Sequence, residues 1–253
     1  MASALWTGRL PKTVHRVLVA AAVTLSLLWT LNQVYLLAAR TAGDGVAGTL
    51  HHACPTNLPS QDNIGFIVKT GASEAHDKLP TQLRTTLSCV EDLLLAGDLD
   101  FEVAGYQIHD VLKNVSQAIR DSDPAFDIYH RQRHLRDDGF ALEQISRSLD
   151  DKASGHNAAW ELDKFKFLPM LYKAYTDMPD KDWYVFIEAD TFLNLNNLLS
   201  WLLQLNASKI LYIGSPSFMS GTKFNHGGSG YVLPGPAIRA FASWYPQVAS
   251  VWD

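Results

Sequence analysis

The sequence lacks any excess of positive charge. Its 253 residues carry a formal net charge of −5, and no basic stripe interleaved with aromatic residues occurs along them. We therefore expect no nucleic-acid partner, because nucleic-acid-binding proteins neutralise phosphates with lysine and arginine. No internal repeat is present either. With 47% hydrophobic and 19% charged residues, the composition is typical of a globular protein of one large or two small domains.

Charge is also absent between Arg16 and Arg40. The 23 residues between them are almost all apolar. At about 1.5 Å per residue, such a helix is long enough to cross a hydrocarbon core of about 30 Å. Because positive charge gathers before this segment, we expect residues 1–16 to be a cytosolic tail and 17–39 a transmembrane signal anchor. Residues 40–63, broken by prolines, then form a luminal stem, and 64–253 a luminal domain.

A cleaved signal peptide is the alternative to an anchor. The sequence "LLAARTAG" could supply the small-residue cleavage site. The apolar core of a signal peptide usually has only about 7 to 15 residues, whereas the run here is longer and follows a tail of 16 residues. These features favour the uncleaved anchor. In both cases most of the chain faces the secretory lumen.

Cysteine is scarce, and both cysteines follow the apolar segment. Cys54 and Cys89 could form a disulfide in an oxidising lumen, although Cys89 in "LSCVEDLLL" could equally be a buried free thiol. Asn114 and Asn206 each begin an Asn-x-Ser sequon, which is a permitted glycosylation site in that compartment.

Strand-like and helix-like patterns alternate after residue 63. We expect strands at 64–68, 93–98, 183–187 and 231–233, and strand-like sequence at 209–218. Helical spacing of apolar residues predicts helices at 78–95, 160–175 and 195–205, the last capped by Asn194 or Asn196, and a final helix entered through Pro236. The polar span 121–157 gives no clear pattern. This order predicts an α/β fold with a mostly parallel sheet and flanking helices.

Two carboxylates follow the most apolar of these strands. "WYVFIEAD" runs from Trp183 to Asp190, so Glu188 and Asp190 come at the carboxyl end of a strand buried on both faces. Ligands of open α/β sheets bind at that edge. Oxygen ligands one residue apart suit Mg²⁺ or Mn²⁺, and alternate residues of a strand share a face. The alternative is that Asp190 or Thr191 caps the next helix and Glu188 is solvated.

Four segments together resemble glycosyltransferase family 31, in particular its fungal members related to Fringe and to core 1 β1,3-galactosyltransferase. They are "VKTGASEA", "LDKFKFLPM", "WYVFIEADTF" and "FNHGGSGYVL", in the order of that family, and they cover most of 64–241. The resemblance implies a GT-A-type, Rossmann-like catalytic domain on a single-pass type II Golgi membrane protein. It also implies transfer of a sugar, galactose above all, from a UDP-sugar to a glycan or glycoprotein acceptor in β1,3 linkage, with inversion and with Mn²⁺ or Mg²⁺ as cofactor. A homodimer is a further option that the sequence leaves open.

The resemblance assigns expected roles to individual residues. Asp190 is the expected metal ligand, and Glu188, where many animal relatives have aspartate, supports the metal or the ribose. Lys69, Thr70 and Gly71 are expected at the nucleotide end of the first strand, with Asp98 near the base. These residues could also form an ordinary turn and a solvated acid.

Two lysines and a glycine-rich loop complete the expected site. Lys164 and Lys166 cannot share one face of a helix, so only one of them can approach the diphosphate, and we expect it to be Lys164. Gly227, Gly228 and Gly230 would let backbone approach the donor sugar or the acceptor, unless they only form a turn.

His226 is expected to line the pocket at most. Trp160 and Trp183 could stack on sugars, although tryptophan is more often a core residue.

The mechanism that the resemblance implies is a single displacement by an acceptor hydroxyl, aided by a carboxylate base. In that family the base and a metal-binding histidine lie downstream of the glycine-rich loop and its helix, whereas this sequence ends at Asp253. We therefore expect a catalytic domain that is incomplete at its carboxyl end, with the catalytic residue outside the sequence. The alternative function is a catalytically incomplete donor-binding or helper protein of the same fold.

Overall fold

The structure is a computed structural model that describes residues 24, 26, 28–30, 33, 54–149 and 158–252, with side chains described to 249. The expected tail 1–16, and all of the expected anchor 17–39 except the few residues just named, lie outside this part of the chain. Within it, no helix is both long and apolar enough to cross a membrane. The described elements below belong to one compact unit, His52–Asp253.

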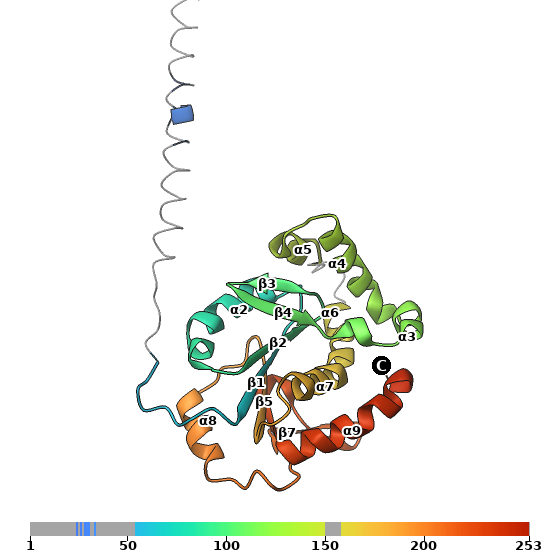
Figure 1. The fold of residues 1–253 in the computed structure, drawn as a ribbon. Coiled ribbons are helices and arrows are strands. Elements are labelled where there is room, and N and C mark those ends of the chain that lie inside the picture. Colours follow the sequence, from blue (N-terminus) through green and yellow to red (C-terminus); the bar gives the residue numbers. More distant parts are fainter. Residues whose placement is uncertain are drawn as a thin grey trace, which may run out of the picture. The chain divides into compact units, whose positions relative to one another are not determined.

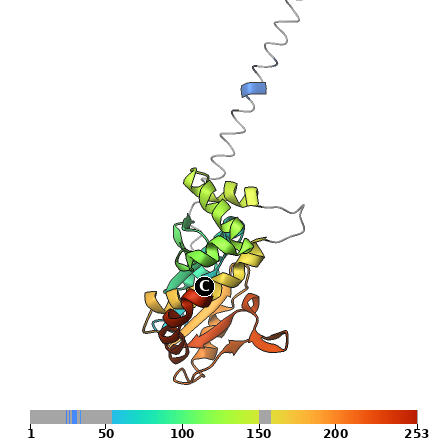
Figure 2. The same cartoon turned by 90° about the vertical axis from the view of Figure 1, so that its right-hand side faces the viewer.

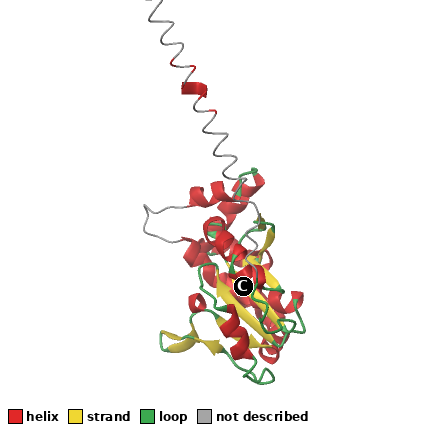
Figure 3. Ribbon diagram, turned by 90° about the vertical axis from the view of Figure 1, so that its left-hand side faces the viewer, coloured by secondary structure: helices red, strands yellow, loops and turns green. Residues whose placement is uncertain are grey.

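A seven-stranded sheet forms the centre of this unit, in the order β3-β4-β2-β1-β5-β9-β6. Four consecutive strands, β4, β2, β1 and β5, run parallel, whereas β3 and β9 run antiparallel to their neighbours. β7 and β8 form a separate hairpin that projects from the main sheet (Figures 2 and 3). The strands are β1 (Ile64–Lys69), β2 (Leu93–Gly97), β3 (Phe101–Val103), β4 (Tyr106–Asp110), β5 (Trp183–Glu188), β6 (Ile213–Gly214), β7 (Pro216–Met219), β8 (Thr222–Asn225) and β9 (Tyr231–Pro234).

Helices cover both faces of the sheet (Figure 1). α7 and α9 lie side by side on one face, and α2 and α8 lie on the other. The expected α/β fold with a mostly parallel sheet is thus confirmed. The helices are α2 (Ala75–Arg84), α3 (Gln117–Ser122), α4 (Asp127–Asp137), α5 (Leu142–Leu149), α6 (Ala158–Asp163), α7 (Phe167–Asp177), α8 (Leu195–Leu202) and α9 (Gly235–Trp252), with short 3₁₀ turns at Thr86–Cys89, Leu112–Asn114, Pro124–Phe126, Lys164–Lys166 and Gly227–Ser229.

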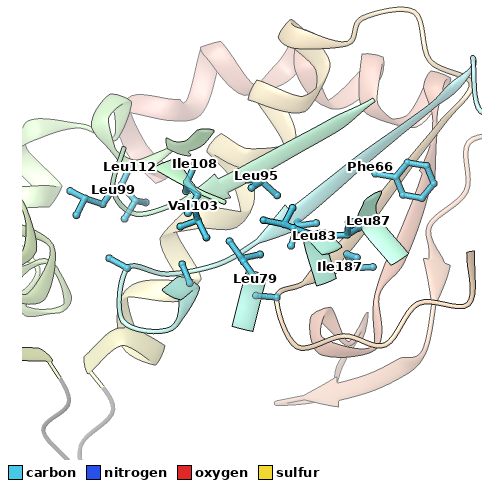
Figure 4. Packing of buried hydrophobic residues seen from close by; sticks show 14 of the residues in the cluster. Phe66, Leu79, Leu83, Leu87, Leu95, Leu99, Val103, Ile108, Leu112 and Ile187 are labelled. Carbon is cyan, nitrogen blue, oxygen red and sulfur yellow. The ribbon is translucent and has the colours of Figure 1, made fainter. Parts of the chain in front are cut away.

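Alternate residues of the central strands enter two separate hydrophobic cores. In β1, Phe66 and Val68 pack with α2 in the larger core, which Figure 4 shows, whereas Ile67 packs against α7. In β5, Val185 and Phe186 divide between the two cores in the same way. Each such side chain contributes about 1.5–3 kcal/mol when fully buried. The apolar run Trp183–Ile187 is therefore a strand buried on both faces, as predicted, and β1 is buried in the same way.

Several expected elements have different limits in the structure. The helix predicted for 78–95 ends at Arg84, because Thr85 leaves helical geometry, and Leu94 belongs to β2. The helix predicted for 160–175 is interrupted by the 3₁₀ turn Lys164–Lys166. The strand-like sequence 209–218 divides between β6 and β7, and the span that gave no pattern contains α4 and α5.

The structure decides between two pairs of alternatives that the sequence left open. Asn194 caps α8, its side-chain oxygen accepting a hydrogen bond from the backbone nitrogen of Asn197 at 3.1 Å. Cys54 and Cys89 form a disulfide, with their Cα atoms 5.4 Å apart. Of the two alternatives that the sequence left open for Cys89, the free thiol is therefore wrong.

Candidate functional site

The four parallel strands each deliver a charged residue to the same edge of the sheet. Lys69 and Glu188 end β1 and β5 and are paired in the strand register. Asp98 follows β2 directly, and Asp110 ends β4. Because ligands of α/β sheets bind beyond the carboxyl ends of parallel strands, this edge is the candidate site.

Five side chains at this edge form a continuous series of ion pairs that alternates in sign. Lys166 Nζ lies 2.9 Å from Asp98 Oδ2 and 2.9 Å from Asp163 Oδ1. Lys69 Nζ contacts the other oxygen of Asp163 and lies 3.2 Å from Glu188 Oε1. The series therefore runs Asp98, Lys166, Asp163, Lys69, Glu188. Three carboxylates and two ammonium groups leave one negative charge.

Most of this charged cluster is buried. Asp98 and Lys166 are each 2% exposed, and Lys69 is 6% exposed. Burial, and next the nearby charge of Lys166, lower the pKa of Lys69, while Glu188 acts in the opposite direction. Backbone groups hold the cluster in place as well: Asp98 accepts a hydrogen bond from the Ala72 nitrogen at 2.8 Å, and Lys166 donates one to the Thr70 carbonyl at 2.9 Å. Buried charges are tolerated only when paired in this way.

Two of the expected glycines lie close to the side chains of this cluster. A Cβ on Gly71 would lie 3.1 Å from Asp98 Oδ2 and 3.2 Å from Lys166 Nζ. A Cβ on Gly227 would lie 2.8 Å from Glu188 Oε1. At Gly228 the near neighbour is His226, at 2.9 Å, and the Glu188 carboxylate is 3.7 Å away. The glycine-rich loop thus lies directly against the Glu188 side chain.

Asp190 has a different environment from Glu188. Its Oδ2 lies 2.7 Å from Lys78 Nζ, which also lies 2.6 Å from Glu74 Oε2. The hydrogen bond from Lys78 lowers the pKa of Asp190. Burial lowers the pKa of Lys78, but its hydrogen bonds to Asp190 and Glu74 outweigh that effect and raise the pKa above its usual value. Glu74, Lys78 and Asp190 thus form a second cluster, whose two carboxylates and one ammonium group leave one net negative charge.

The turn after β5 explains why Glu188 and Asp190 have separate partners. β5 ends at Glu188, so the alternation of a strand does not extend to Asp190. Thr191 closes the turn: its hydroxyl accepts a hydrogen bond from the Glu188 nitrogen at 3.0 Å and donates one to the Gly228 carbonyl at 2.9 Å. Gln82 donates to the carbonyl of Ala189 at 2.5 Å. Hydrogen bonds therefore connect the turn that contains Glu188 and Asp190 to α2 and to the glycine-rich loop.

The structure brings Lys166 to the cluster, and not Lys164. Lys164 is exposed and lies 3.9 Å from Asp123. Lys166 therefore lies at the sheet edge, whereas Lys164, the lysine expected to approach the diphosphate, lies outside the charged cluster. Lys166 stands three residues after Asp163, and the 3₁₀ turn between them has about three residues per turn, which places both on one side.

The other expected site residues lie as follows. Thr70 is 1% exposed, and its hydroxyl has no hydrogen-bond partner in the described part of the chain. Trp183 is a core residue, whereas Trp160 is 67% exposed. His226 is exposed, and its Nδ1 lies 3.1 Å from Ser229 Oγ. The sequon asparagines Asn114 and Asn206 are both exposed.

The site residues that the sequence analysis did not name include Asp163, Gln82 and Thr191, and also Glu74, Lys78 and Asp110. Asp163 connects the two lysines, yet in the sequence it is one acid in the helical segment "WELDKF". Its position three residues before Lys166 is the one signal that could have identified it. Gln82 and Thr191 carry no such signal, because their role depends on backbone groups distant in sequence.

Among the residues that the structure describes, no group of three or more histidine, cysteine, aspartate or glutamate side chains is arranged to hold a metal ion. The candidate oxygen ligands are two carboxylates with different partners. Their chemistry fits a hard divalent cation, which takes oxygen ligands and keeps positions open for water or phosphate. Asp190 is the more accessible of the two, with 55% of its side chain exposed against 28% for Glu188.

Comparison of the sequence with protein-family models and with curated proteins found no match.

Proposed function

We propose that this chain is a glycosyltransferase that binds a UDP-sugar at the carboxyl edge of the sheet through Mn²⁺ or Mg²⁺. The proposed reaction is transfer of the sugar, galactose above all, to a hydroxyl of a glycan or glycoprotein acceptor in β1,3 linkage, with inversion. The proposed location is a Golgi membrane, with the catalytic domain in the lumen. The observation that carries the proposal is the pair of acidic clusters around Glu188 and Asp190 at the edge where ligands of α/β sheets bind.

The charge of this edge supports a divalent cation. Each of the two clusters carries one net negative charge, as counted above, so the edge as a whole would repel a free diphosphate. A divalent cation bound by Asp190 and Glu188 would reverse that repulsion, and it would also neutralise charge on the departing UDP. The protein groups that would bind the nucleotide directly are then neutral ones.

Uncharged groups that could form hydrogen bonds to a nucleotide lie beside the carboxylates. Thr70 has a buried hydroxyl without a partner in the described residues, although buried polar groups are nearly always hydrogen-bonded. Gly71 and Gly227 place backbone directly beside the cluster, because a Cβ on either would contact the side chains of Asp98 and Lys166 or of Glu188. Lys69 stays paired with Asp163 if Glu188 turns toward a cation.

Release of Asp190 from Lys78 requires little free energy. Lys78 and Asp190 have 37% and 55% of their side chains exposed. Exposed ion pairs are typically worth about 0–1 kcal/mol. A cation can therefore replace the lysine ammonium at Asp190 without opening the core.

One observation favours the second candidate function, a donor-binding or helper protein without efficient turnover. Both expected metal ligands already have a lysine partner: Lys78 for Asp190 and Lys69 for Glu188. An ammonium group paired with a carboxylate can take the place of a metal ion. In that case nucleotide binding would not depend on a divalent cation.

The test is calorimetric titration of UDP and UDP-galactose into the full chain, held in lipid nanodiscs, with Mn²⁺ or with chelator. We expect metal-dependent binding that Asp190→Asn weakens at least tenfold and that Asp180→Asn, a change at an exposed aspartate, leaves unchanged. Metal-independent binding would favour the helper protein. No UDP binding by the folded chain would overturn the proposal. Transfer of labelled galactose to glycan acceptors then separates the enzyme from a binding protein.

A further inference from the structure

The hairpin of β7 and β8 exposes two large apolar side chains at its tip. Its strands form a two-stranded sheet of their own, which projects from the main sheet (Figures 2 and 3). Phe218 and Met219 end β7 and are 71% and 62% exposed. An isolated two-stranded hairpin is at best marginally stable in water, and apolar surface in water is unfavourable. The tip therefore has the composition of a surface that a partner covers.

The two apolar side chains lie on opposite faces of the hairpin. Phe218 is paired with Lys223, and Met219 with Thr222, in the strand register. Successive residues of a strand point to opposite faces, so Phe218 and Lys223 share one face and Met219 lies on the other. An antiparallel sheet that packs against protein commonly buries one face and keeps the other polar. Apolar residues on both faces instead fit a medium that surrounds the tip, and the acyl chains of a lipid bilayer are such a medium.

The charge of this part of the chain fits an anionic surface. Residues 191–252 contain no aspartate or glutamate, although the chain as a whole has a formal net charge of −5. The same stretch contains Lys209, Lys223 and Arg239, and all three are exposed. Because Lys223 lies directly across the hairpin from Phe218, its alkyl stem can follow the apolar side chain while its ammonium group reaches a lipid head group.

A second exposed segment lies at the base of the hairpin. The Tyr212 hydroxyl donates a hydrogen bond to the Asn225 carbonyl at 3.3 Å, and the Asn225 side chain donates one to the Tyr212 carbonyl at 3.0 Å. Ile210 and Tyr212 are exposed, and Lys209 precedes them. A tyrosine, with an apolar ring and a polar end, is typical of the boundary between lipid and water. The base of the hairpin therefore has side chains suited to the head-group region, and the tip has side chains suited to the acyl chains.

We propose that the β7–β8 hairpin inserts Phe218 and Met219 into a lipid bilayer that carries anionic head groups, while Lys223 binds those head groups. Removal of the two apolar side chains from water favours the insertion, and attraction between lysine and anionic lipid adds to it. This contact belongs to the folded domain and is distinct from the anchor expected at 17–39. It does not require the sugar transfer proposed above.

The chain contains a second hairpin with the same turn geometry, which provides a matched control. Ser220 and Gly221, between β7 and β8, have φ angles of 48° and 82°, and Ala104 and Gly105, between β3 and β4, have 52° and 83°. Ser220→Cys and Ala104→Cys therefore place a thiol for labelling at equivalent exposed positions of the two turns. The two native cysteines are joined in a disulfide and do not react with the label.

The test measures the surroundings of a polarity-sensitive fluorophore on each of these two variants. The full chain is reconstituted into vesicles of equal parts phosphatidylcholine and phosphatidylserine. We expect the emission of the label at position 220 to shift to shorter wavelength and to be quenched by lipids that carry a nitroxide on the acyl chain. The label at position 104 should show neither effect.

Further substitutions in the Ser220→Cys chain identify the side chains that insert. Phe218→Ser should lower the ratio of inserted to free hairpin at least tenfold, whereas Phe192→Ser, at another exposed phenylalanine, should leave it unchanged. Lys223→Gln should lower it about fivefold in these vesicles, and by less in vesicles of phosphatidylcholine alone. UDP binding by the Phe218 variant should stay unchanged, so failure of this inference is distinguishable from failure of the proposed function.

Four results would overturn the inference. The first is a label at position 220 that neither shifts nor is quenched, and the second is equal quenching of the labels on the two hairpins. The third is a shift to shorter wavelength without quenching by the nitroxide lipids, because a second copy or another protein would then cover the tip. The fourth is an equal effect of the two serine variants.

Discussion

Lys166 and Asp98 form an ion pair that is almost completely removed from solvent. Lys166 Nζ lies 2.9 Å from Asp98 Oδ2, and the two side chains are 2% and 3% exposed. The same ammonium group lies 2.9 Å from Asp163 and donates to the Thr70 carbonyl. One lysine therefore ties the ends of β1 and β2 to the segment that precedes α7.

We expect Lys166→Met to lower the free energy of unfolding by about 3–5 kcal/mol, because it leaves Asp98 buried without its cation. Lys164→Met removes the same charge two residues away, where the side chain is 57% exposed. It should cost less than about 1 kcal/mol. Urea unfolding followed by tryptophan fluorescence measures both. Equal effects of the two changes would show that the buried pair contributes no more than a surface pair.

On the proposed function, Gly227→Ala should weaken UDP binding at least tenfold and leave the fold nearly intact. The new Cβ would lie 2.8 Å from Glu188 Oε1, which is the end of a flexible side chain and can turn away. The stability loss should stay within about 1 kcal/mol, as for other partly exposed ion pairs. Calorimetry gives the affinity and urea unfolding the stability. Unchanged affinity would mean that the position of the Glu188 carboxylate does not matter for the nucleotide.

The chain should lose stability in alkaline solution as its buried tyrosines ionise. Burial raises the pKa of Tyr184 to about 12. In the unfolded chain the pKa of tyrosine is about 10, so above that pH the unfolded state loses its proton first. The contribution of Tyr184 to the free energy of unfolding is therefore complete below about pH 10 and is lost as the pH rises from about 10 to about 12. The free energy of unfolding, measured across this range, should fall less steeply for Tyr184→Phe. An identical pH dependence of the two chains would show that the loss of stability does not come from Tyr184.

Reduction of the Cys54–Cys89 disulfide should destabilise the chain by on the order of 4 kcal/mol, as chain entropy predicts for a loop of this length. The two cysteines are 35 residues apart in sequence. Urea unfolding with and without reductant measures the loss. The double variant Cys54→Ser, Cys89→Ser should match the reduced chain and respond no further to reductant. If reductant still lowered the stability of this variant, the loss would not come from the disulfide.

The parts of the fold that depend on burial could be predicted from the sequence. β1, β5 and β9 were recognisable because their apolar residues continue without a polar interruption. The same property hid the end of α2: Leu79, Leu83 and Leu87 have helical spacing, and the buried strand β2 continues the apolar pattern without a period of its own. Pattern alone could not show where one element ends.

The candidate site could be predicted only in part. Lys69, Asp98 and Glu188 were identifiable because each stands at the end of a predicted strand. The choice between Lys164 and Lys166 depended on a 3₁₀ turn that interrupts a helical pattern, and the sequence does not show that interruption. The partners of Asp190 depended on the turn at Thr191, whose hydrogen bonds reach Gly228, 37 residues away.

The ion pairs of the site also have a kinetic consequence. Lys69 and Asp163 are 94 residues apart in sequence, and Lys166 reaches the Thr70 carbonyl across 96 residues. Contacts between such distant parts of a chain form slowly, because closing a long loop costs entropy before any interaction repays it. Lys69, Asp98 and Lys166 therefore acquire their partners late in folding. A nascent chain that has emerged only as far as β4 contains three of the four parallel strands, with Lys69 and Asp98, but neither Asp163 nor Lys166, which connect those two residues.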